Sequence, residues 1–110
     1  MKLPNADRAF LDIAKLRDYS LDLEHKEGRH KARVFAAALG LTRNDASRLR
    51  EHLLEAARTH DCELGRKTNL GQRYILDFTL VCRGKSARLR SVWNVRPNED
   101  FPRLVTCYVL

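Results

Sequence analysis

The clearest pattern of apolar and polar positions in the chain has the period of an α-helix and lies between Gly28 and Gly40. Apolar side chains recur there three and four residues apart, which places them on one face of a helix. These side chains are Ala32, Phe35, Ala36 and Leu39. Gly40 can adopt the left-handed conformation that often follows the last helical residue. The pattern therefore predicts a helix over residues 28–40 with one buried face.

A second amphipathic helix is predicted from residue 46 onward. The preceding run, Thr42–Asp45, supplies side chains for its start, with Asn44 or Asp45 accepting hydrogen bonds from free backbone amides. Apolar residues again recur at helical spacing, and charged residues occupy the other positions. The apolar set is Ala46, Leu49, Leu53, Ala56 and Ala57. We expect this helix to bury its apolar stripe and to expose a charged face.

The N-terminal part of the chain is less regular. Ala9–Ile13 fits either an edge strand or the start of a helix, and Lys15–Leu21 suggests a helix. Asp22–Glu27 is highly charged, so we predict an exposed loop that leads into the helix over residues 28–40.

From Asp61 onward apolar and polar side chains alternate, which is the pattern of strands with one buried face. A tight hairpin turn is expected at Arg83–Ser86. The predicted strands cover residues 62–67, 73–83, 87–95 and 104–110. Helices followed by strands predict an α+β fold, with N-terminal helices packed on a C-terminal antiparallel sheet of about four strands. At 110 residues we expect a single domain over residues 1–110.

Charge adds a functional indication to this fold. The chain has 21 Lys and Arg against 14 Asp and Glu, a formal net charge of +7, and both halves are basic. A basic field attracts polyanions, of which nucleic acid is the commonest, although an acidic protein partner or a merely soluble surface also fits. No stretch has the roughly 20 apolar residues that cross a bilayer, so we expect a cytoplasmic protein without a membrane partner.

The sequence offers no pattern for a metal or cofactor. Cys62, Cys82 and Cys107 are odd in number and widely spaced, so we interpret them as small buried hydrophobes rather than zinc ligands or disulfides. Carboxylates and histidines do not recur at metal-ligand spacing, and phosphate-binding glycine loops are absent. We therefore expect no metal and no cofactor.

Candidate chemistry is concentrated in the first turn of the predicted helix, which carries His30, Lys31 and Arg33. Hydroxyl-bearing residues of the strands, such as Ser91, Thr106 and Tyr108, could complete a site without metal. Such a set suits RNA cleavage by the 2′-hydroxyl, which needs an acid, a base and cations. Histidine can serve as acid or base, and Lys and Arg stabilise charge that develops on the phosphate.

The same basic face could bind RNA without cutting it. Arg29, Arg88 and Arg90 would extend the binding track, and Trp93 would stack on bases. A single Trp among strand residues is more commonly part of the core, so a buried Trp93 is the alternative.

Several segments resemble a family of small bacterial domains of unknown function, whose members resemble toxin components encoded beside a small antitoxin-like protein. The segments are Lys2–Ala6, Gly28–Phe35, Gly71–Phe78 and Asp100–Leu110. More remotely, a helix with Gly-Arg-His-Lys followed by strands with a Trp and a terminal Thr-x-Tyr is similar to the barnase, colicin and RelE superfamily of metal-independent ribonuclease toxins.

This resemblance implies a ribonuclease site between helix and sheet, formed by His30, Lys31, Arg33, Thr106 and Tyr108. It also implies RNA as the substrate and a small antitoxin-like protein, encoded nearby, as the partner. Two alternatives remain: a noncatalytic RNA-binding or ribosome-associated module, and a protein-interaction module that is itself the antitoxin-like half of a pair.

Overall fold

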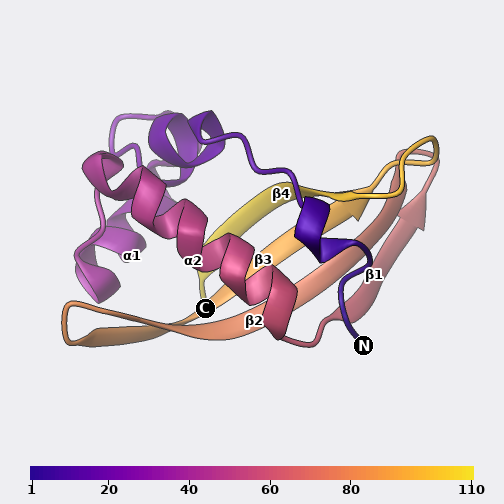
Figure 1. The fold of residues 1–110 in the computed structure, drawn as a ribbon. Coiled ribbons are helices and arrows are strands. Elements are labelled where there is room, and N and C mark those ends of the chain that lie inside the picture. Colours follow the sequence, from indigo (N-terminus) through magenta and orange to yellow (C-terminus); the bar gives the residue numbers. More distant parts are fainter.

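Four antiparallel strands form one sheet in the order β1-β2-β3-β4, in a computed structural model that describes residues 1–110 (Figure 1). The strands are β1 (Glu63–Thr68), β2 (Gly71–Cys82), β3 (Lys85–Val95) and β4 (Pro102–Val109). Arg83 and Gly84 join β2 to β3 with φ angles of 53° and 79°. Two residues with positive φ make a loop whose twist matches that of the flanking strands, so β3 begins two residues earlier than the sequence predicted.

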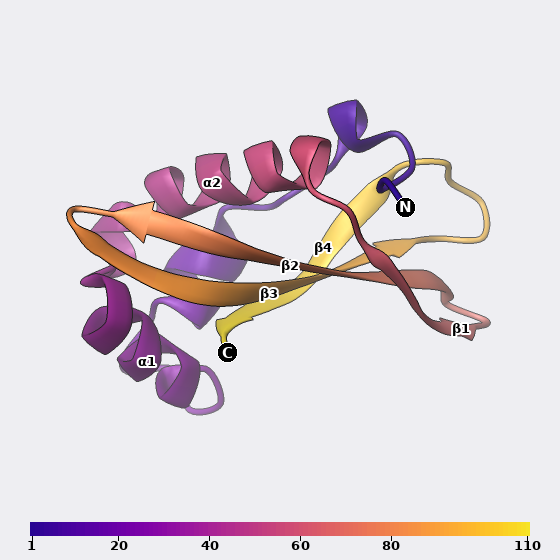
Figure 2. The same ribbon diagram turned by 90° about the horizontal axis from the view of Figure 1, so that it is seen from below.

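Two α-helices precede the sheet, α1 (Arg29–Leu39) and α2 (Ala46–Thr59). Helix α1 contacts β3 and β4, whereas α2 contacts β2. Figure 2 shows α2 above β2 and β3, and α1 below their hairpin end. The α+β prediction, with N-terminal helices on a four-stranded antiparallel sheet, is therefore confirmed. None of the helices is both long and apolar enough to cross a membrane.

The N-terminal segment contains a short 3₁₀ turn, η1 (Ala6–Arg8), and a π-helix, η2 (Leu16–Ser20), which lies where the sequence suggested a helix over Lys15–Leu21. Residues 9–13 form neither of the predicted alternatives, because only Phe10 makes a bridge, a parallel one to Arg103 of β4. This segment runs beside β4 and is held there by tertiary contacts rather than by a regular element of its own.

One apolar cluster joins the helices to one face of the sheet. Trp93 has no exposed surface, and its indole Nε1–H donates to Ser91 Oγ at 3.0 Å. The Ser91 hydroxyl in turn donates to the carbonyl of Leu76 at 3.0 Å. Trp93 is thus a core residue that cannot stack on RNA bases, and Ser91 supports it instead of belonging to a surface site. All three cysteines are free and buried, and burial raises the pKa of the Cys107 thiol to about 12.

A β-bulge in β4 decides which of its side chains leave the core. Val92 pairs with Thr106 and Trp93 with Leu104, so Val105 is an extra residue on β4. Because a bulge adds one residue to a strand, the side chains of β4 that follow Val105 point to the opposite face from the one that simple alternation would give them. Leu104 therefore faces the core, while Thr106 lies on the opposite face of the sheet.

Asp45 closes a short turn, η3 (Arg43–Asp45), that leads into α2, but its side chain makes no capping hydrogen bond to α2 itself, so it does not cap that helix in the predicted way. Its Oδ2 accepts the N–H of Thr42 at 3.0 Å, and its Oδ1 accepts Arg83 of the hairpin at 2.7 Å. The hydrogen bond from Thr42, followed by that from Arg83, holds the pKa of Asp45 below its usual range against the effect of burial.

We expect Asp45→Asn to destabilise the protein at neutral pH by about 1 kcal/mol, because the amide can still accept from Thr42 but no longer carries the charge that pairs with Arg83. The folded pKa lies below the unfolded value of about 3.9, so ionised Asp45 contributes stability above about pH 4 that is lost as the pH falls through its folded pKa. Urea denaturation between about pH 7 and pH 2 should show the two proteins converging in acid. A constant difference at every pH would contradict this assignment.

Candidate functional site

The candidate site is centred on the ammonium group of Lys31, in the first turn of α1. Lys31 Nζ donates to Thr106 Oγ1 of β4 at 3.1 Å. It also lies 5.5 Å from the ring centroid of Tyr19 and 5.3 Å from that of Tyr108. Aromatic faces attract a cation at such distances. Three segments far apart in the sequence therefore converge on one half-buried charge.

Lys31 lacks a carboxylate partner: no Asp or Glu oxygen lies within 4.0 Å of its ammonium group. Charges taken out of water are normally paired, because desolvation of an isolated charge is costly. The hydroxyl and the two rings orient the ammonium group but leave its positive charge uncompensated. A negatively charged ligand could supply the missing partner.

A second cation, Arg90, stands on the same face of the sheet. Arg90 lies on β3, where it is paired with Tyr108 of β4 on one side and with Asp77 of β2 on the other. Its guanidinium donates two hydrogen bonds to the Asp77 carboxylate, both 2.9 Å long. The hydrogen bonds to Asp77, with a smaller effect from the neighbouring Tyr108, raise the pKa of Arg90, and Arg90 lowers the pKa of Asp77. Arg90 is thereby held in a fixed orientation beside Tyr108.

A hollow of about 550 Å³ opens beside Lys31, between η2 and β4. Its volume lies within the range of small-ligand sites. Its polar and charged lining consists of Asp12, Lys15, Tyr19, Ser20, Lys31 and Thr106. A ligand in this hollow would reach the ammonium of Lys31 and the hydroxyl of Thr106 together.

The structure brings only some of the sequence-predicted residues together. Lys31, Thr106, Tyr108 and Arg90 form one cluster. The other predicted residues of the first helical turn, Arg29, His30 and Arg33, are exposed and make no side-chain hydrogen bond or ion pair. Neighbouring helical positions point about 100° apart, so the turn that directs Lys31 at the sheet directs its neighbours elsewhere. Arg88 is exposed as well and donates to Thr79 Oγ1 at 3.3 Å.

Sequence reasoning missed Tyr19 and Asp77. Counting back from a two-residue turn at Arg83 and Gly84 places Asp77 opposite Arg90, so the hairpin pattern contained that partner. Nothing in the sequence pointed to Tyr19, because its place over Lys31 depends on how η2 packs against α1 and β4.

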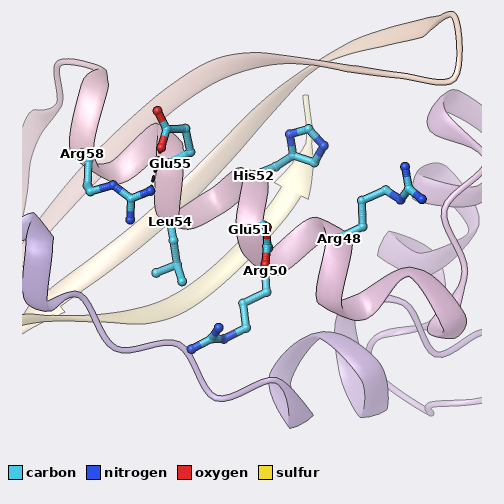
Figure 3. A pocket seen from close by; sticks show the side chains of 7 residues that line it. All are labelled: Arg48, Arg50, Glu51, His52, Leu54, Glu55 and Arg58. Carbon is cyan, nitrogen blue, oxygen red and sulfur yellow. Dashed lines mark hydrogen bonds and ion pairs between the residues drawn. The ribbon is translucent and has the colours of Figure 1, made fainter.

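The outer face of α2 also forms a shallow hollow lined by charged residues, but it is a weaker candidate. Figure 3 shows these side chains fanning outward from the helix rather than meeting at one point. Arg58 pairs with Glu55 at 2.6 Å, and Arg50 Nε donates to the carbonyl of Leu11 at 3.1 Å. Most of these charged side chains face water, and Arg50 holds the N-terminal segment against α2. Their presence is therefore explained without a ligand.

Fold and site together define a basic α+β domain with an uncompensated cation between its first helix and the end of its sheet. The chain belongs to the family described as domain of unknown function DUF6883, whose model matches residues 2–110. The expected relationship to a family of small domains of unknown function is thus confirmed. No curated protein sequence matches the chain.

Among solved structures, the fold is similar to a chain of a contact-dependent growth inhibition toxin–immunity protein complex from Klebsiella pneumoniae 342. The TM-score is 0.70 at 15% sequence identity, with 91% of this chain and 98% of that chain covered. At this identity the likeness shows a shared fold, and it assigns no residue and no activity to this chain.

Proposed function

We propose that the protein is a metal-independent endoribonuclease that acts as the toxin of a growth-inhibition pair. The observation that carries this proposal is the half-buried ammonium of Lys31, which has no carboxylate partner and borders an open hollow. A phosphodiester of RNA is an anion of the right chemistry to occupy that position, and the net charge of +7 attracts it.

In the proposed reaction the 2′-hydroxyl of the substrate attacks the adjacent phosphorus and the 5′-oxygen of the next nucleotide leaves. Lys31 and Arg90 stabilise the negative charge that develops on the phosphate oxygens. Thr106 orients the phosphate. Tyr108, between the two cations, accepts the 2′-hydroxyl proton on its phenol oxygen while its own proton passes to the departing 5′-oxygen, so the products are a 2′,3′-cyclic phosphate and a free 5′-hydroxyl. The exposed residues of the first helical turn, Arg29, His30 and Arg33, would contact flanking RNA.

Charge favours the toxin over the immunity role within such a pair. The structural neighbour comes from a toxin–immunity complex, and its fold is shared by this chain. A surface that binds RNA is cationic, whereas a protein that covers such a surface is expected to be acidic. This chain is basic in both halves, so we infer that its partner is a small acidic antitoxin-like protein.

A noncatalytic RNA-binding module is the second candidate. The observation that favours it is the absence of an imidazole from the lining of the hollow beside Lys31. Histidine is the commonest group for proton transfer near neutral pH. Binding without cleavage would use the same cations and the same face.

We expect the purified protein to cleave total RNA equally well with and without EDTA. Products should carry a 2′,3′-cyclic phosphate or a 3′-phosphate, because the 2′-hydroxyl is the nucleophile, and DNA should remain intact because it lacks that hydroxyl. Gel analysis and mass spectrometry of the products provide the measurement. Cleavage of a substrate with 2′-deoxyribose at the scissile position would disprove the mechanism. RNA that is retarded on a gel but stays intact would favour the binding module.

A further inference from the structure

We propose that a groove along the outer edge of β4 holds single-stranded RNA, with Phe10 as a platform on which a base stacks. This inference rests on the proposed function, because it identifies the substrate class of the Lys31 site as an extended single strand. It adds a second contact region, at the end of the groove remote from Lys31.

The groove consists of two adjoining hollows of about 550 and 300 Å³. Both are lined by the same four residues, Asp12, Lys15, Leu104 and Val105, so the two hollows are continuous. One end lies at Lys31 and Thr106, and the other lies at Phe10 and Arg96. Thr106 and Arg103 are about 10 Å apart along an extended strand, a distance that two or three nucleotides span.

The charge of the groove suits a polyanion along its whole length. Four cationic side chains line it against one carboxylate, that of Asp12. The cations are Lys15, Lys31, Arg96 and Arg103, of which Arg96 and Arg103 share the carboxylate of Glu99, just outside the lining. Lys15 makes no ion pair, and Asp12 already accepts the N–H of Ala14 at 3.0 Å. A strand lying in the groove would therefore find unpaired cations at Lys31 and Lys15, and two further guanidinium groups at the Phe10 end that share one carboxylate.

Phe10 is held in place although 48% of it is exposed. Its N–H donates to the carbonyl of Pro102 at 2.8 Å, and its carbonyl accepts the N–H of Leu104 at 3.0 Å. The guanidinium carbon of Arg103 lies 5.0 Å from the ring centroid of Phe10 and 5.0 Å from that of Phe101. Two hydrogen bonds of 2.8 Å to Glu99 fix that guanidinium. The ring is thus presented to solvent with little freedom left to lose on binding.

An exposed aromatic ring within a cationic groove is the arrangement by which proteins bind single strands, since unpaired bases stack on the ring while phosphates follow the cations. A duplex keeps its bases stacked on one another and offers no free face to Phe10. The groove therefore favours single-stranded RNA over a duplex of the same sequence.

The test measures binding of a fluorescent ten-nucleotide 2′-O-methyl RNA, which a 2′-hydroxyl nuclease cannot cleave, by anisotropy at low salt. Phe10→Ala should weaken binding by about 5- to 100-fold, the usual effect of losing one stacked base. Phe10→Leu keeps an apolar contact with β4 and should weaken binding similarly, whereas Phe10→Trp should retain it. Val81→Ala, which removes an exposed apolar side chain from β2, is the matched control and should bind normally.

Circular dichroism should show all four variants folded. Unchanged affinity of Phe10→Leu for the ten-nucleotide strand, or tighter binding of a duplex, would overturn the inference. The probe cannot be cut, so it tests binding apart from cleavage. If binding depends on Phe10 but natural RNA stays intact, the nuclease proposal is refuted and the groove is supported. If natural RNA is cleaved but binding does not depend on Phe10, the groove is refuted and the nuclease proposal is supported.

Discussion

Lys31→Met should lower the rate of RNA cleavage by about two to three orders of magnitude, the usual effect of removing one group that stabilises transition-state charge. Methionine keeps the apolar stem of the side chain against Tyr19 and Tyr108 but cannot donate to Thr106 or attract a phosphate. Induced expression of the variant should no longer arrest bacterial growth. Cleavage of a short RNA under single-turnover conditions measures the loss directly.

Lys26→Met is the matched control, because Lys26 is an exposed lysine of the preceding loop and its side chain makes no hydrogen bond or ion pair. It should cleave at nearly the wild-type rate. His30→Ala, made in parallel, should retain most of the cleavage, since His30 lies outside the cluster. A His30→Ala variant that is folded but inactive, beside an active Lys31→Met, would transfer the proton-exchange role to His30 and refute the assignment to Lys31 and Tyr108.

Trp93→Ala should destabilise the protein by about 3–5 kcal/mol, the cost of truncating a large aromatic side chain in a packed core. Trp93 is fully buried, and it pairs across the sheet with Tyr74 on one side and Leu104 on the other. Denaturation in urea, followed by circular dichroism because the chain has a single Trp, gives the free energy of unfolding. A loss below about 1 kcal/mol, with weakened RNA binding, would return Trp93 to the surface role suggested by the sequence.

Ser91→Ala separates the hydrogen bond of Trp93 from its packing. The substitution removes the only acceptor of the buried indole N–H, and it also takes a donor from the carbonyl of Leu76. Leaving a buried polar group unpaired costs about 1–3 kcal/mol. The same denaturation experiment should therefore rank Ser91→Ala between the wild type and Trp93→Ala.

Much of the fold could be predicted because it depends on local periodicity. The apolar stripe from Ala32 to Leu39 gave α1, and the alternation through β2 and β3 gave the hairpin. In both cases the spacing of apolar residues indicates the type of element and also which of its faces is buried. Residues close together in the sequence are therefore sufficient to predict the element. Phe10 and Tyr19 belong to a segment without such a pattern, and their positions follow from contacts with β4 and Lys31.

The candidate site was only partly predictable for a related reason. Composition indicated a basic surface, and the first turn of α1 indicated where cations gather. It could not indicate which of the three polar residues His30, Lys31 and Arg33 faces the sheet, because that depends on how the helix is rotated when its apolar stripe packs.

The sequence by itself determined the two helices, the antiparallel hairpin and the basic character of the chain, because each depends on residue type and spacing alone. Tertiary structure decided the site. The bulge at Val105 directs Thr106 away from the core, and the packing of η2 sets Tyr19 over Lys31. Both depend on contacts between residues far apart in the chain, whose energies no local pattern records.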